Sequence, residues 1–323
     1  MSNLLLWLGR SHKAPLHIRV DKSFIVCGLT NDRRLYDLLY DYHTRIASLR
    51  IGLVDLAFFE GRDFPSMRVL DVGRWYRRDS SHPIQWGRMP ELRSLYLGPL
   101  YLFPNPDPTD VHAVPLNSLP PLKTLVLHTI TCTSLSRHSP SLVALMLRTV
   151  HLDAISGSMD FPSLTHLALF DVRGLKPHIN APYLVTYYES GCTIDESFSA
   201  PIPSLVEYGV CGVYNSFDSA PTEWHRSFPN IQKLFIREDP AVLISLFHSL
   251  ATHRHSLPAL QMISAGPSRI WGAKLTKSDQ KIMESLIQER SEACLRDIVL
   301  CFEPGQPLHM VPSGRYVSHC LIG

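Results

Sequence analysis

The sequence predicts an α/β solenoid, in which short repeats stack and each repeat adds one strand to a parallel sheet. The first supporting observation is the motif Leu-x-x-Leu-x-Leu, which begins at Leu92, Leu122, Leu142 and Leu164. The second is a proline two residues before the first leucine of each of these motifs. The third is the interval of 20 to 30 residues between successive motifs, which is close to the period of about 20 to 29 residues in leucine-rich repeats.

The series is longer when any apolar residue is accepted in place of leucine. Nine prolines then occupy the same slot, at intervals of 20 to 30 residues. They are Pro65, Pro90, Pro120, Pro140, Pro162, Pro182, Pro203, Pro229 and Pro258. Two further units, which begin at His43 and near Glu292, lack the proline. We therefore expect leucine-rich repeats over residues 43–276.

Each motif has the pattern of a strand with one buried face, because its last two leucines alternate with a residue that faces solvent. A unit of about 20 residues leaves about a dozen for the return path, so successive strands are expected to be parallel neighbours. The proline ends the return segment without removing a hydrogen bond between strands. We expect an irregular horseshoe with a curved sheet on its concave face and short helices or loops on its convex face.

The turn that follows each strand is expected to be loosely ordered. Eight residues after the first leucine, leucine-rich repeats usually carry an asparagine or cysteine. Here that slot holds mostly apolar residues: Val54, Trp75, Leu100, Ile130, Val150, Val172, Cys192 and Val213. The asparagine ladder is therefore absent.

Residues 1–42 are expected to cap the N-terminal end of the repeats. The segment starts with an apolar, helix-like run over residues 4–8. Residues 15–20 alternate as a strand does, and residues 33–42 have apolar side chains at helical spacing.

Residues 277–323 are expected to cap the other end. A helix is predicted over residues 277–293, with Ser278 or Asp279 as its N-cap, followed by a strand-like run over residues 295–302. Such caps cover the end of a sheet that would otherwise be open.

Composition argues against several classes of protein. The chain has 31 basic and 29 acidic residues, a formal net charge of +2, so it has no strong field to attract nucleic acid or an anionic membrane. No stretch approaches about 18 apolar residues, and the first residues lack the features of a signal peptide. The 7 cysteines never form Cys-x-x-Cys, which argues against a disulfide framework or a zinc knuckle. We expect a cytoplasmic or nuclear protein.

Three segments have some features of a chemical site. Residues 266–274 resemble a phosphate-binding loop, but the glycine spacing is one residue too long and the lysine does not adjoin the second glycine. The histidines His248, His253 and His255 have no cysteine or carboxylate suitably close for a metal site. Residues 74–78 join basic and aromatic side chains as a nucleic-acid contact does, although one such patch on a near-neutral chain is more often an exposed loop. We expect neither an enzyme nor a bound cofactor or metal; an enzyme, or a nucleotide- or metal-binding protein, that uses residues 248–274 is the alternative.

The residues between the buried leucines are expected to project from the concave face. Tyrosine, phenylalanine, methionine and arginine are enriched at protein interfaces. The candidate protein-binding residues are Arg50, Asp71, Tyr96, Val126, His128, Met146, Arg148, Phe170, Tyr188, Phe235 and Arg237. The alternative is that some are ordinary surface residues or fill a narrow concavity.

Four features of the chain match one family. They are the opening LLLWLGRSHKAPLHIRV, the unit TRIASLRI, the series of P-x-L-x-x-L-x-L units, and the closing helix with LRDIVLCF. In these features the chain resembles the leucine-rich-repeat portion of the F-box-like proteins of mushroom-forming fungi, whose repeats open on a similar "LWLxRS...PLxIxI" segment. The resemblance implies repeats that present a protein substrate to a cullin ubiquitin ligase, while an N-terminal F-box binds the Skp adaptor. An F-box would precede residue 1, so Skp binding is expected only if an upstream F-box exists.

The repeat pattern and this resemblance together predict a non-catalytic protein–protein interaction module. It would be the substrate-recognition part of an F-box-type ubiquitin ligase receptor that lacks its F-box, with a protein substrate as its partner. An inactive, truncated paralogue is a further alternative.

Overall fold

The chain forms two compact units, Met1–His138 (unit 1) and Ser139–Gly323 (unit 2). The computed structural model describes residues 10–11, 13–20, 37, 39–52, 54–76, 86–99, 113–116, 119–128, 131–133, 135–152, 158–174, 178–190, 201–211, 220–267, 275–294 and 298–302.

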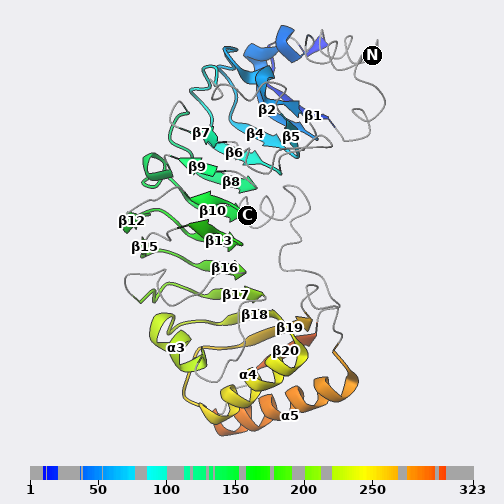
Figure 1. The fold of residues 1–323 in the computed structure, drawn as a ribbon, viewed down its shortest axis with the longest axis vertical. Helices are drawn as coiled ribbons and strands as arrows, with labels where there is room; N and C mark the ends of the chain where they lie inside the picture. The colour runs from blue at the N-terminus through cyan, green and yellow to red at the C-terminus, as the bar shows by residue number, and fades with distance from the viewer. Residues whose placement is uncertain are drawn as a thin grey trace. The chain divides into compact units, whose positions relative to one another are not determined.

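The longer described strands of each unit lie in a main sheet, and the neighbouring strands within a unit are parallel. In unit 1 it contains β1 (Leu16–Val20), β2 (Ile46–Ile51), β4 (Val69–Val72), β6 (Ser94–Leu97) and β8 (Thr124–His128). In unit 2 it contains β10 (Ala144–Arg148), β13 (His166–Phe170), β16 (Thr186–Ser190), β17 (Glu207–Cys211), β18 (Lys233–Glu238), β19 (Met262–Pro267) and β20 (Val299–Phe302). These 12 strands follow one another in sequence order (Figure 1). The predicted α/β class and parallel sheet are confirmed, and the arrangement is consistent with a solenoid of the leucine-rich-repeat type.

The leucines of the motif form the core. All three leucines of the motifs that begin at Leu92, Leu122, Leu142 and Leu164 are at most 6% exposed. Burying one such side chain stabilises the fold by about 1.5–3 kcal/mol. In weaker units Tyr187 and Tyr208 take a leucine position and are fully buried. The core face of the repeat strands is thus mostly apolar, with Glu189 on β16 as a buried polar exception.

The proline slot is the second residue of a tight turn that leads into each strand. The N–H of Met67 donates to the carbonyl of Phe64 at 3.1 Å, across Pro65. The same bond joins Leu164 to Phe161 at 3.2 Å. Proline suits this position because its fixed φ matches the second residue of a type I or II turn.

Backbone hydrogen bonds hold the described part of three turns in unit 1 for which loose order was expected. Gly52, Gly73 and Gly98 follow β2, β4 and β6, and their N–H groups donate to carbonyls of the preceding strand at 3.1, 2.8 and 2.7 Å. A Cβ atom on Gly98 would lie 1.9 Å from the carbonyl oxygen of Gly73, so the backbones approach closely enough to require glycine. In unit 2 the corresponding turns use Thr149 and Asp171, both at a φ of 50°.

Where the slot eight residues after the first leucine is described, it is filled by buried apolar side chains in place of asparagine. Val54, Trp75 and Val150 are fully buried, and Val172 is 7% exposed. The other four slot residues, Leu100, Ile130, Cys192 and Val213, lie outside the described residues. Short parallel strands then tie neighbouring turns together. They pair β3 (Val54–Asp55) with β5 (Trp75–Tyr76), β7 (Ala113–Pro115) with β9 (Thr131–Thr133), β11 (His151–Leu152) with β14 (Arg173–Gly174), and β12 (Ser158–Asp160) with β15 (His178–Asn180).

A side-chain ladder links successive repeats. In four of the described units, the residue after the proline slot donates from its side chain to the carbonyl of the proline-slot residue in the preceding unit. The bonds run from Ser66 to Thr44 (2.6 Å), Ser163 to Pro140 (3.2 Å), Ser204 to Pro182 (2.8 Å) and Asn230 to Pro203 (2.8 Å). Each bond satisfies a carbonyl that the turn leaves outside the sheet.

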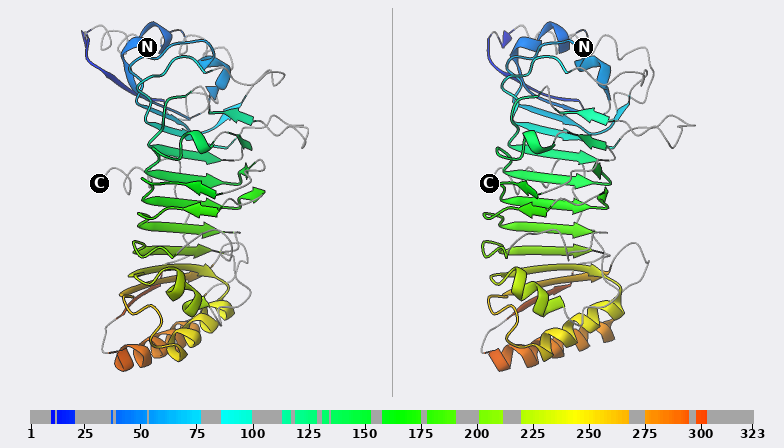
Figure 2. Two further views of the ribbon diagram at one scale, coloured as in Figure 1. Left: turned by 90° about the vertical axis from the view of Figure 1, so that its left-hand side faces the viewer. Right: turned by 60° about the vertical axis from the view of Figure 1, so that its left-hand side comes forward.

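Helices concentrate in the C-terminal part of unit 2. They are α3 (Ala220–Ser227), α4 (Pro240–Thr252) and α5 (Lys277–Cys294), and the described 3-10 helices are η2 (His43–Arg45), η3 (Leu56–Phe59) and η4 (Leu135–Arg137). Helices α4 and α5 pack against each other (Figure 2). No helix in the described part of the chain has the length and apolar content that a bilayer crossing needs.

The predicted helix after residue 276 is confirmed, but its N-cap is different. Thr276 precedes the first helical residue, and its hydroxyl accepts from the N–H of Asp279 at 3.1 Å. Asp279 in turn accepts from the N–H of Thr276 at 2.8 Å. This reciprocal pair is a capping box, so Asp279 is the third helical residue and Ser278 is not the cap.

The N-terminal segment agrees with prediction where it is described. The expected strand is β1, and residues 37 and 39–41 are helical. The helix-like run over residues 4–8 lies outside the described residues. The boundaries of the two caps stay predictions.

Unit 1 holds a buried histidine, which predicts a loss of stability in mild acid. His138 Nδ1 accepts from the N–H of Leu122 at 3.4 Å, and Nε2 lies 3.0 Å from the carbonyl oxygen of Leu116. Burial lowers the pKa of His138 below its ordinary 6.5. The unfolded chain therefore takes up the proton more readily, and the free energy of unfolding falls as the pH drops from about 6.5 through the lower folded-state pKa. Urea titrations across this range will measure the slope.

The control for this prediction compares two variants. His138→Gln is expected to be less stable at neutral pH but to show a shallower pH dependence. Val185→Thr, at an exposed position and without an ionisable group, is expected to keep the wild-type slope. An unchanged slope in His138→Gln would contradict the assignment.

Candidate functional site

The non-core face is the face of the main sheet that carries the side chains between the core leucines. In unit 1 its central row consists of residues paired in register on β1, β2, β4, β6 and β8. These are Arg19, Arg50, Asp71, Tyr96 and Val126. The structure therefore brings four of the sequence-predicted residues side by side.

Most of this row in unit 1 is buried. Asp71, Tyr96 and Val126 are 4%, 8% and 7% exposed, which corrects the expectation that they project into solvent. Arg50 Nε lies 2.6 Å from Asp71 Oδ2. Burial raises the pKa of Asp71, and the positive charge of Arg50 opposes that shift.

The equivalent row in unit 2 contains an accessible aromatic pair. Its residues on β10, β13, β16, β17 and β18 are paired in register: Met146, Ala168, Tyr188, Gly209 and Phe235. Met146 is buried, whereas Tyr188 and Phe235 are half-buried. The two rings lie 6.0 Å apart between centroids at 59°. They contact each other although a strand separates them, because Gly209 on that strand has no side chain.

A neighbouring row, toward the C-terminal ends of the unit 2 strands, is mostly covered. It pairs Arg148, Phe170, Ser190, Cys211 and Arg237. Phe170 is 5% and Arg237 2% exposed, so neither projects freely as predicted. Arg237 Nη1 donates to the carbonyls of Ile236 and Ser264 at 2.9 and 3.2 Å. These bonds hold the guanidinium within the fold. Arg148 is half-buried.

His128, the remaining predicted residue, is the last residue of β8 in unit 1. It is half-buried and follows the core residue Leu127.

Sequence reasoning missed a third row, toward the N-terminal ends of the unit 2 strands. It pairs His166, Thr186, Glu207 and Lys233. The residue just before the second leucine of a motif shares a face with the residue just after it, since side chains alternate along a strand. Applying that alternation to both positions would have found the row.

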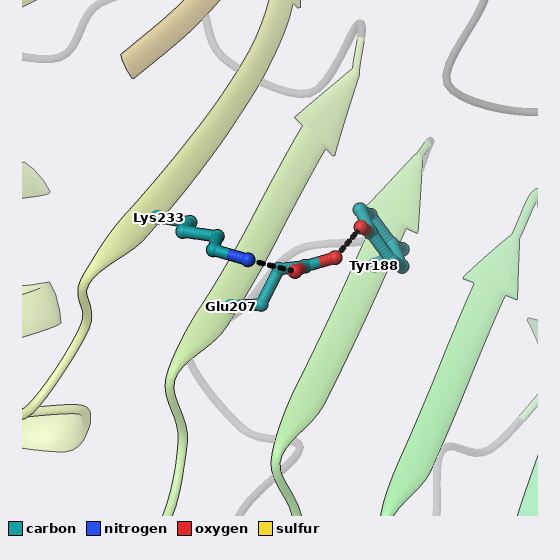
Figure 3. Close-up of polar contacts among 3 residues, drawn as sticks. All are labelled: Tyr188, Glu207 and Lys233. Carbon is teal, nitrogen blue, oxygen red and sulfur yellow. Dashed lines mark hydrogen bonds and ion pairs between the residues drawn. The ribbon is translucent and has the colours of Figure 1, made fainter. Parts of the chain in front are cut away.

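Glu207 connects the polar row to the aromatic pair (Figure 3). Its Oε1 accepts a hydrogen bond from the Tyr188 hydroxyl. Its Oε2 lies 3.8 Å from Lys233 Nζ, with side-chain exposures of 49% for Lys233 and 23% for Glu207. This separation is longer than a hydrogen bond, so the ammonium group keeps donors for other acceptors.

His166 borders this group and is expected to be neutral at pH 7. Burial lowers its pKa, and the negative charge of Glu207 opposes that shift. The hydroxyl of Thr165 lies 2.8 Å from its Nδ1.

The core side of β16 holds a buried carboxylate in a leucine position. Glu189 is 1% exposed and accepts from the hydroxyl of Tyr187 at 2.8 Å and from that of Tyr208. The two tyrosines that replace leucines thus supply the hydrogen bonds that a buried acid requires. This explains why the unit is weak in leucine.

The other chemical motifs are separate from this face. Trp75 is fully buried and donates from Nε1 to the carbonyl of Gly98 at 2.9 Å, so its ring is not available to stack on a base. His248, His253 and His255 are exposed. Within the described residues, no three His, Cys, Asp or Glu side chains are grouped to hold a metal ion. Residues 268–274 of the glycine-containing segment lie outside the described part of the chain.

No model of a known protein family matches the chain, and no curated protein sequence matches it. The chemistry of the non-core face is therefore the basis for assigning a function.

Proposed function

We propose that the chain is a leucine-rich-repeat solenoid that binds a protein partner through the non-core face of unit 2 and catalyses no reaction. The observation that carries this proposal is the accessible group formed by Tyr188, Glu207, Lys233 and Phe235. Aromatic side chains on a rigid sheet contribute contact area at a small entropy cost.

The architecture suits such a role. Parallel strands from different repeats place these four side chains on one surface, so the group needs little rearrangement to bind. The hydrogen bond from Tyr188 to Glu207 fixes one ring, and the contact with Phe235 limits the other.

The resemblance to the F-box-like proteins extends the proposal to a cellular role. The partner would be a protein substrate, and the chain would be the substrate-recognition part of an F-box-type ubiquitin ligase receptor in the cytoplasm or nucleus. The Skp adaptor would bind only through an F-box upstream of this chain.

Removing both rings is expected to abolish partner capture. The purified, tagged chain and its Tyr188→Ala/Phe235→Ala variant are used as baits, and captured proteins are measured by quantitative mass spectrometry. Truncating one aromatic hot spot costs about 2 kcal/mol, so the double variant should bind its partner at least about thirtyfold more weakly.

The matched control is Tyr183→Ala. Tyr183 is 64% exposed and lies in the turn before β16 rather than on the non-core face. It should capture the same proteins as the wild type. Equal capture by the double variant, with an unchanged circular dichroism spectrum, would place the interface elsewhere. The absence of any specific partner would favour an inactive paralogue.

A further inference from the structure

The non-core face of unit 2 carries an excess of positive charge. Among its described residues, Arg148, Lys233 and Arg237 are basic and Glu207 is acidic. Lys233 is the most exposed of these three cations, since Arg148 is half-buried and Arg237 is 2% exposed.

Lys233 is the most accessible of these cations. Its side chain is 49% exposed, and its only described ion-pair partner, Glu207, is 3.8 Å away. Glu207 is already engaged by the Tyr188 hydroxyl. A carboxylate from a partner would thus meet an ammonium group with donors available, and charge-assisted bonds of this kind are among the stronger ones.

Apolar side chains lie beside Lys233 along its own strand and on the strands that follow. Phe235 comes two residues after it on β18, on the same face. Met262 is paired with Lys233 in register on β19, and Val299 is paired with Met262 on β20. Val299 is 59% exposed. A ligand that fits this surface must present apolar groups close to its negative charge.

An extended protein segment meets this requirement, and a nucleic acid does not. Nucleic-acid sites depend on several phosphate contacts, whereas Arg237 is 2% exposed and Arg148 is half-buried. The sugar and phosphate groups of a nucleic acid are polar, so their contact with the apolar side chains of Met262 and Val299 would add little to the free energy of binding. In an extended segment, alternate residues lie about 6.6–6.8 Å apart, which matches the spacing of Lys233 and Phe235, two residues apart on β18.

On the basis of the proposed function, we propose that the unit 2 face binds an extended protein segment in which an aspartate or glutamate is flanked by apolar residues. The acid pairs with Lys233, and the flanking residues pack on the Tyr188–Phe235 pair and on Met262 and Val299.

A random peptide library displayed on phage is selected on the purified chain, and enriched peptides are measured by fluorescence anisotropy. We expect enriched peptides to combine acidic and apolar residues. Lys233→Met should weaken their binding about tenfold, while Glu207→Gln should strengthen it several-fold because it removes the competing negative charge. The opposite signs distinguish charge recognition from a general loss of structure. Lys281→Met, at an exposed position on α5, is the control and should leave binding unchanged.

Several outcomes would overturn the inference. They are enrichment of basic or proline-rich peptides, no enrichment at all, weaker binding by Glu207→Gln, or tight binding of labelled single-stranded oligothymidylate at physiological salt. In each of these cases, loss of partner capture by Tyr188→Ala/Phe235→Ala would still support the proposed function. Unchanged capture by that double variant would reject the proposed function independently.

Discussion

Gly98→Ala is expected to lower the free energy of unfolding by about 3 kcal/mol. The new methyl group would lie 1.9 Å from the carbonyl oxygen and 2.6 Å from the carbonyl carbon of Gly73. Both are backbone atoms, so the overlap cannot be relieved by turning a side chain. The shift would also disturb the bond from Trp75 Nε1 to the carbonyl of Gly98. Urea-induced unfolding followed by far-UV circular dichroism measures the change.

Two glycines provide graded controls for this substitution. A Cβ on Gly73 would lie 3.0 Å from the carbonyl oxygen of Gly52, so Gly73→Ala should cost about 1 kcal/mol. Gly61 has a φ of 63° and nothing within 4 Å of the added atom. Gly61→Ala should therefore show only backbone strain, about 1 kcal/mol. Equal costs at Gly98 and Gly61 would contradict the close approach of the turns.

Arg290→Met is expected to lower the free energy of unfolding of unit 2 by about 3 kcal/mol. The guanidinium is 2% exposed and donates from α5 to four carbonyls at and beyond the end of α4. They belong to Leu250 (2.7 Å), His253 (3.4 Å), Ser256 and Leu257 (3.4 Å). The last turn of α4 has no basic residue of its own, so Arg290 supplies the positive charge that a helix C-terminus favours.

Arg290→Lys separates charge from geometry. Lysine keeps the positive charge but lacks the planar fork that reaches several carbonyls together, so this variant should recover only part of the stability. Lys281→Met on the exposed side of α5 should be neutral. Full stability in Arg290→Met would show that water satisfies these carbonyls equally well.

The sheet could be predicted from the sequence because its causes are local and repeated. Alternation around Leu125 and Leu127 determines which face of β8 is buried, and Pro162 marks the turn that leads into β13. The described turns after β4 and β6 could not be predicted in this way, because the close approach of Gly73 and Gly98 joins residues from different repeats.

The sequence predicts which residues lie on the non-core face, but it does not predict how exposed their side chains are. Alternation correctly placed Asp71 and Tyr96 in one row with Arg50. Their exposures of 4% and 8% do not follow from the alternation of side chains, which determines only the face on which each residue lies. Tyr188 and Phe235 stay accessible. This depends on a neighbouring strand, because Gly209, which lies between them on β17, has no side chain. Exposure is thus a property of the assembled row.

The side-chain ladder from Ser66, Ser163, Ser204 and Asn230 has a consequence for how such a chain can evolve. Each of these four units contributes a side-chain donor toward the unit before it, whereas Pro121 and Ala259, which follow Pro120 and Pro258, have no such donor. Removal or duplication of a whole unit next to one of the four, from one proline slot to the next, would again join the donor to an equivalent carbonyl. A junction in any other phase would leave the donor without its acceptor. Recombination that changes the length of the surface is therefore expected to keep these four joints when it acts on whole units.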